Sequence, residues 1–95
     1  MKDSIIQDIK AILSAYSGVD SAIIYGSRAK GNFKPYSDID ISLKGNLTLN
    51  EKWKIENNID DLLLPYKTDI VLFSNITNKD LIEHINRVGK TFYAR

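Results

Sequence analysis

The sequence of 95 residues contains no cysteine. Disulfide bonds are therefore excluded, and so are zinc sites built on thiolates. A chain without thiols suits a reducing compartment, and we expect a cytoplasmic protein.

Long hydrophobic runs and a strong excess of one charge are missing as well. No apolar stretch approaches the ~20 residues needed to cross a bilayer, and the first residues lack the apolar core of a signal peptide. The formal net charge is +1, so the chain has no broad positive field of the kind that marks nucleic-acid-binding proteins. We expect a soluble protein with neither a membrane nor a nucleic acid as its partner.

The composition is that of a small globular protein, with 43% hydrophobic and 26% charged residues. This length fits one domain over residues 1–95. A chain so short buries only about two-thirds of the surface that its unfolded form exposes. Its core is therefore thin, and a partner that covers apolar surface would help it.

Hydrophobic spacing predicts three helices and three strands. We expect helices over residues 5–17, 48–64 and 78–88, and strands over residues 21–25, 37–44 and 68–73. Thr48 and Glu51 form a capping box that opens the second helix, and Pro65 ends it. Residues 91–93 fit either a short edge strand or a docking segment.

This order predicts an α+β fold, a small mixed sheet with helices packed mainly on one face. Only residues 26–37 separate the first two strands, which favours an antiparallel pair with a helical turn inserted between them. A full helix joins the second and third strands, which should be parallel. One edge of the sheet then gathers the end of the first strand and the starts of the other two.

Acidic residues lie at that edge. Asp38 and Asp40 alternate with Ile39 and Ile41, so the two acids share one strand face, with Cα atoms ~7 Å apart. Like charges this close repel unless a cation neutralises them, and magnesium takes one or two carboxylates together with phosphate oxygens. Two solvated acids on an exposed strand remain the simpler interpretation of this short motif alone.

A third acid changes that balance. Asp69 stands at the start of the third strand, where it again interrupts a β pattern. Taken alone it fits a turn residue equally well. Because the topology brings it to the edge that carries Asp38 and Asp40, the three together predict a metal site.

The first strand ends in a segment suited to phosphate. Gly26 lets the backbone approach a ligand closely, and Ser27 adds a hydroxyl donor. The residues that follow can open a helix with free N–H groups, while Arg28 and Lys30 can balance the charge of a triphosphate. An ordinary polar turn explains this segment just as simply when it is taken alone.

Taken together, Gly26-Ser27, the ten following residues, Asp38-Ile39-Asp40 and the later Asp69 resemble the DNA polymerase β-type nucleotidyltransferase superfamily. Within it, the chain looks like the minimal nucleotidyltransferase (MNT) family, the antitoxin half of two-gene toxin–antitoxin pairs. The resemblance covers nearly the whole chain, and its combined motif is specific.

The resemblance implies a role for each motif residue. Gly26 and Ser27 would hold the triphosphate, and Asp38 and Asp40 would bind two magnesium ions. Asp69 would complete the second metal site and help to activate the acceptor hydroxyl. Two such ions can stabilise the attacking and leaving oxygens of an in-line displacement at the α-phosphate.

The resemblance also implies a substrate and a partner. Family members of this size transfer AMP from ATP to a tyrosine of a helical toxin of the HEPN class, in type VII toxin–antitoxin pairs. The partners implied are therefore a hetero-oligomer with such a toxin or a homo-oligomer. Neither the acceptor nor the preferred base is encoded in the motifs. The alternatives are an antitoxin that acts by contact alone, and nucleotidyl transfer to a small molecule such as an aminoglycoside.

Three further residues are given structural interpretations. His84 is expected to be a solvated residue of the last helix. Trp53 is expected in the core because it falls in phase with Leu49. Tyr25 adjoins the glycine segment and could flank a nucleotide, but a core role at the end of its strand is favoured.

Overall fold

The computed structural model describes residues 3–25, 39–64 and 67–95. Its elements are α1 (Asp3–Ser14), β1 (Val19–Tyr25), β2 (Ile39–Gly45), α2 (Leu49–Asp60), β3 (Thr68–Leu72), the 3-10 helix η1 (Phe73–Asn75), α3 (Lys79–Val88) and β4 (Lys90–Ala94). The predicted order of helices and strands is confirmed. The tail, for which the sequence left two alternatives, forms the strand β4.

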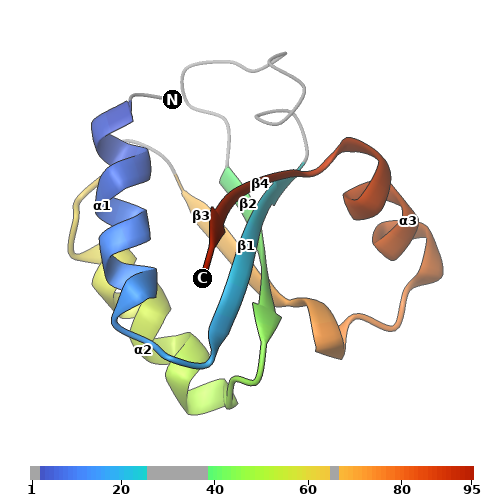
Figure 1. Ribbon diagram of the computed structural model, residues 1–95, viewed down its shortest axis with the longest axis horizontal. Coiled ribbons are helices and arrows are strands. Elements are labelled where there is room, and N and C mark those ends of the chain that lie inside the picture. Colours follow the sequence, from blue (N-terminus) through green and yellow to red (C-terminus); the bar gives the residue numbers. More distant parts are fainter. Residues whose placement is uncertain (1–2, 26–38, 65–66) are drawn as a thin grey trace.

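The strands of the described residues form one mixed sheet in the order β3-β2-β1-β4. β1 pairs antiparallel with both β2 and β4, whereas β2 and β3 run parallel. These directions confirm the α+β topology expected from the connection lengths. The sheet stands between two layers of helix, with α1 and α2 on one side and α3 on the other (Figure 1).

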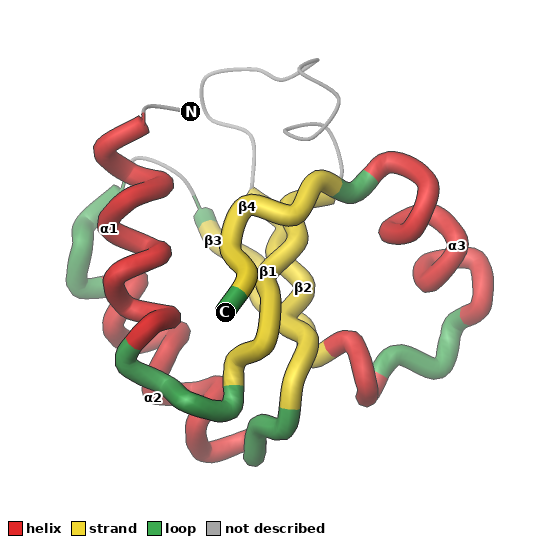
Figure 2. The backbone as a smooth tube through the Cα atoms, in the orientation of Figure 1, coloured by secondary structure: helices red, strands yellow, loops and turns green. Residues whose placement is uncertain are grey.

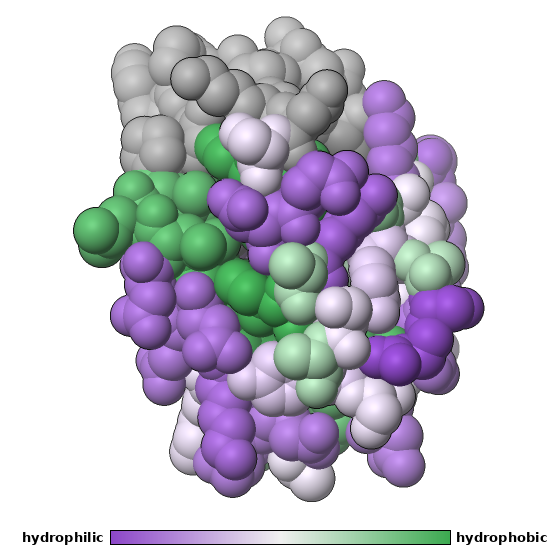
Figure 3. All heavy atoms as spheres, turned by 60° about the vertical axis from the view of Figure 1, so that its left-hand side comes forward, coloured by the Kyte–Doolittle hydropathy of each residue, from purple (hydrophilic) through white to green (hydrophobic). Residues whose placement is uncertain are grey.

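The larger hydrophobic cluster lies between the sheet and the pair α1 and α2. Alternation in β2 sends Ile39, Ile41 and Leu43 into this cluster, and each is at most 1% exposed. Ile9 of α1 and Ile59 of α2 meet them there. On the outside of this layer hydrophilic side chains predominate, with apolar surface gathered in one region (Figure 3).

The opposite face of the sheet carries a smaller cluster, made by Ile23 and Tyr25 of β1 with Ile85 of α3. α3 stands apart from α1 and α2, on the far side of the strands (Figure 2). The helices α1 and α2 thus cover one face of the sheet. The third described helix, α3, covers part of the opposite face, which bears the even-numbered residues of β2.

Local interactions explain where the helices begin and end. The Thr48–Glu51 capping box at the start of α2 is present as predicted, with the Glu51 N–H donating to Thr48 Oγ1 at 3.2 Å. α1 has no basic residue in its last turn. Instead Arg95, from the far end of the described chain, donates to the carbonyl oxygens of Ser14 and Tyr16. This guanidinium supplies the positive charge that favours a helix C-terminus.

The predicted burial of α2 is partly wrong. Ile55 and Ile59 are buried as expected, but Trp53 is 58% exposed and Leu49 is 54% exposed. Because Trp53 and Leu49 are four residues apart, they share one stripe of the helix. Ile55 and Ile59 form a second stripe, and the sheet covers only that one.

Candidate active site

Asp40 and Asp69 are brought together by the sheet. Asp40 of β2 is the register partner of Asp69 in the parallel strand β3, and neighbouring strands lie about 4.8 Å apart. Asp40 is half-buried and Asp69 is exposed. The expected convergence of these two acids is therefore observed, at the edge where β2 and β3 begin.

The alternation of β2 determines the face on which the acids lie. Ile39 and Ile41 enter the larger cluster, so Asp40 between them points to the opposite face. That face is the one on which α3 packs, and it is not the open, solvated surface that an isolated strand would offer.

Tyr25 completes a row of three residues across three strands. It is the register partner of Asp40 in the antiparallel pair β1–β2, so the two side chains are neighbours on the same face. Tyr25 is only 8% exposed. Burial, followed by the negative charges of Asp40 and Asp69, raises the pKa of the Tyr25 phenol above its ordinary value of 10.0.

His84 joins this row from α3, and its expected solvation is wrong. The residue is half-buried, and its ring lies edge-on to that of Tyr25, with centroids 6.3 Å apart and planes at 81°. A single histidine beside a glutamate gave no sequence signal for this contact. Only the packing of α3 against β1 reveals it.

Below the row, the same face of β2 is closed. Ser42 is fully buried, and its Oγ has no hydrogen-bond partner among the described residues. Lys44 follows, with its Nζ 4.5 Å from the centre of the Phe73 ring. At the acidic end of this face, Asp69 is exposed.

The donor set at this end suits magnesium. The described residues contain no cluster of three potential metal ligands, but the Asp40–Asp69 pair supplies the one or two carboxylates that this ion takes from a protein. Asp69 forms no ion pair with any described residue. A divalent cation would relieve the repulsion between the two charges.

The remaining predicted site residues lie outside the described residues. They are Gly26, Ser27, Arg28, Lys30 and Asp38, together with the helical turn expected after the first strand. Tyr25 directly precedes this segment and Ile39 directly follows it, and both lie at the acidic edge. The roles of the five predicted site residues in this segment stay predictions.

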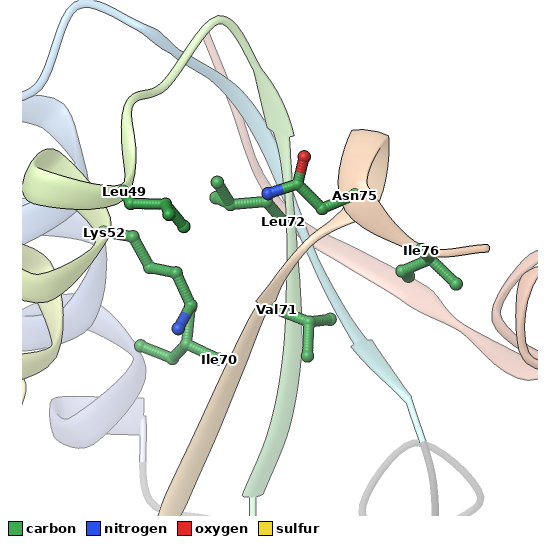
Figure 4. Close-up of a pocket in the computed structure, with 7 residues that line it drawn as sticks. All are labelled: Leu49, Lys52, Ile70, Val71, Leu72, Asn75 and Ile76. Carbon is green, nitrogen blue, oxygen red and sulfur yellow. The ribbon is translucent and has the colours of Figure 1, made fainter. Parts of the chain in front are cut away.

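A pocket of about 260 Å³ lies elsewhere, along the β3 edge of the sheet. Its lining comes from β3, from the start of α2 and from the segment around η1: Leu49, Lys52, Ile70, Val71, Leu72, Asn75 and Ile76 (Figure 4). Lys52 extends toward Ile70 there (Figure 4) and pairs with Glu56 at 2.6 Å. None of Tyr25, Asp40 and Asp69 lines this pocket.

Comparison with known proteins identifies the fold. Among solved structures, the chain is similar to a toxin–antitoxin complex with AMP-PNP, at a TM-score of 0.78 and 19% identity over 95% of this chain and 73% of that one. It is also similar to a complex of tri-AMPylated HEPN toxin with MNT antitoxin from Shewanella oneidensis, at 0.74 and 17% over 100% and 74%. A protein provisionally described as a minimal nucleotidyltransferase gives 0.72 and 22% over 93% and 92%.

No curated protein matches the chain. Within the described ranges, no helix has the length and apolar character needed to span a membrane. The family model described as polymerase beta, nucleotidyltransferase, matches residues 7–95, which include every residue of the predicted site. The chain therefore belongs to the polymerase beta nucleotidyltransferase family and is, as its resemblance implied, a nucleotidyltransferase domain.

Proposed function

We propose that this chain is the antitoxin of a toxin–antitoxin pair and transfers AMP from ATP to a tyrosine hydroxyl of a HEPN-class toxin. The observation that carries the proposal is the Asp40–Asp69 pair, in register where β2 and β3 begin. A nucleotidyltransferase needs acidic residues at such a place, because they hold the cations that balance the charge of a triphosphate.

The proposed chemistry is a displacement at the α-phosphorus. The acceptor oxygen forms a bond to that phosphorus, the bond to the bridging oxygen breaks, and pyrophosphate leaves. Asp69, which is exposed, is suited to accept the proton of the acceptor hydroxyl. Magnesium, when bound, would neutralise the negative charge that gathers on the carboxylates and phosphates.

The remaining roles follow from the family motif. Asp38 and Asp40 are proposed to hold the metal ions together with Asp69. Gly26 and Ser27 are proposed to hold the triphosphate, while Arg28 and Lys30 balance its charge. The likeness to toxin–antitoxin complexes, one with AMP-PNP and one with an AMPylated toxin, supports ATP as the donor and a toxin as the acceptor.

Labelled ATP tests this function directly. With magnesium and the cognate toxin, label from the α-phosphate should appear on the toxin, and label from the γ-phosphate should not. Asp69→Asn should abolish transfer while leaving toxin binding intact. Asp20→Asn is a matched control, because Asp20 is also an exposed strand acid but lies at the opposite end of β1.

The outcomes separate the alternatives. Transfer of the γ label would indicate kinase chemistry and overturn the proposal. Full protection of cells by a folded Asp69→Asn variant would indicate an antitoxin that acts by contact alone. Transfer to a small molecule such as an aminoglycoside, but not to the toxin, would indicate the third function.

A further inference from the structure

Two residues outside the family motif's acids lie near the acidic pair, one beside Asp40 and the other against the first. Tyr25 occupies the same row as Asp40 and Asp69, and His84 contacts Tyr25 from α3. Both Tyr25 and His84 lie on the face to which Asp40 points, and neither is solvated as a free surface side chain would be.

Carboxylates that bind a metal depend on the residues around them. Residues that fix the orientation of a metal-coordinating side chain contribute much of the affinity for the metal. Their loss typically costs 10–100-fold in metal binding or activity. Asp40 is flanked in its row by one residue of each neighbouring strand. On the β1 side, the residue beside it is Tyr25.

We propose that Tyr25 and His84 are positioning residues for Asp40. His84 holds the Tyr25 ring in place, and Tyr25 fixes the Asp40 carboxylate for metal binding. This inference rests on the metal-dependent nucleotidyl transfer proposed above.

The choice of tyrosine supports this role. A buried phenol keeps its O–H near a polar partner, and the charges that act on the Tyr25 phenol are those of Asp40 and Asp69. The rest of its cluster is aliphatic or aromatic: Ile23, Ile85, Val71, Phe73, Ile76 and Leu81. A phenylalanine would fill the same space among these residues, so the hydroxyl serves the acidic side.

The contact from His84 explains how the phenol is held. α3 reaches the smaller cluster mainly through Ile85, which is 1% exposed, and through the half-buried Leu81. The adjacent His84 places its ring edge-on against Tyr25. This contact needs an aromatic ring and not a particular charge, so phenylalanine should replace histidine without loss.

Metal binding provides a test that does not depend on turnover. Mn²⁺ would be titrated into the full chain in the presence of α,β-methylene ATP, which cannot be cleaved at the α–β bond, with free Mn²⁺ measured by electron paramagnetic resonance. Tyr25→Phe should weaken Mn²⁺ binding by about tenfold. His84→Ala should weaken it less, and His84→Phe should restore the wild-type value.

Two controls separate positioning from general damage. Tyr93→Phe removes a hydroxyl from a tyrosine that packs against the larger cluster, and it should leave Mn²⁺ binding unchanged. In the Tyr25→Phe background, His84→Ala should have no further effect, because His84 acts through the phenol. Thermal unfolding of each variant would identify a loss of folding.

Each outcome of the Mn²⁺ titration either supports or overturns the positioning roles of Tyr25 and His84. Unchanged Mn²⁺ binding in folded Tyr25→Phe would overturn the inference, and His84→Phe as weak as His84→Ala would overturn the part played by His84. If the wild type binds Mn²⁺ but transfers no AMP, the proposed function fails while the titration still decides the positioning role. If the wild type binds no Mn²⁺, both fail.

Discussion

Asp40 and Asp69 are register partners on adjacent parallel strands, so two like charges face each other across one row of the sheet. Such an arrangement destabilises a sheet unless another charge compensates. A cation bound between the two carboxylates would offset this repulsion.

Magnesium and ATP should consequently stabilise the fold, by about 2.7 kcal/mol at a ligand concentration 100 times Kd. Asp69→Asn should raise the stability without ligands, by about 0.5 kcal/mol, and should remove most of the gain on adding them. Thermal unfolding with and without both ligands measures the two effects. The idea is contradicted if Asp69→Asn shows the same ligand-induced shift as the wild type.

Ser42 should be replaceable by alanine with a gain in stability. Its hydroxyl is fully buried and has no partner among the described residues, and an unsatisfied buried polar group costs about 1–3 kcal/mol. Ser42→Ala should raise the free energy of unfolding by about 1 kcal/mol, measured by urea denaturation. Ser74→Ala, at an exposed position of η1, should change it little. A clear loss in Ser42→Ala would mean that the hydroxyl has a partner.

Leu63 is another residue whose replacement should stabilise the chain. Its φ is 53°, in the left-handed region, and its side chain is 87% exposed. This conformation costs a leucine about 1 kcal/mol, whereas glycine adopts it freely. Leu63→Gly should raise the melting temperature by about 4 °C. Leu64→Gly should lower it, because Leu64 packs against the larger cluster.

The raised pKa of the Tyr25 phenol predicts how the free energy of unfolding falls at alkaline pH. Its pKa is raised above 10.0 in the fold, so the folded state keeps a proton that the unfolded state loses first. The resulting contribution to the free energy of unfolding is fully present below about pH 10. It is lost as the pH rises through the raised pKa. Urea unfolding between pH 8 and 11 should show this fall. Tyr25→Phe should flatten it, and Tyr93→Phe should not.

The parts of the fold that rest on local pattern were predictable. Alternation in β2 separated Ile39 and Ile41 from Asp40, and the connection lengths gave the strand directions that align Asp40 with Asp69. The capping box at Thr48 fixed the start of α2. These signals depend on nearby residues and on the chain length between elements.

The misjudged residues depend on packing between distant elements. Trp53 has the spacing of a core residue, but the sheet covers only the neighbouring stripe of α2, so Trp53 stays exposed. His84 has no motif around it, and its contact with Tyr25 exists because α3 returns to the acidic face. No periodicity reveals which face of a sheet a late helix will cover.

The exposure of the side chains changes along the row of Tyr25, Asp40 and Asp69. Among the described residues, exposure increases from the buried Tyr25 through the half-buried Asp40 to the exposed Asp69 on the edge strand β3. On the β1 side, His84 packs edge-on against the Tyr25 ring. Among the described residues, an incoming side chain from the β3 flank would meet Asp69 before Asp40. The row of described residues is therefore asymmetric, and under the proposed function an acceptor that presents its hydroxyl from the β3 flank would reach the exposed Asp69 first.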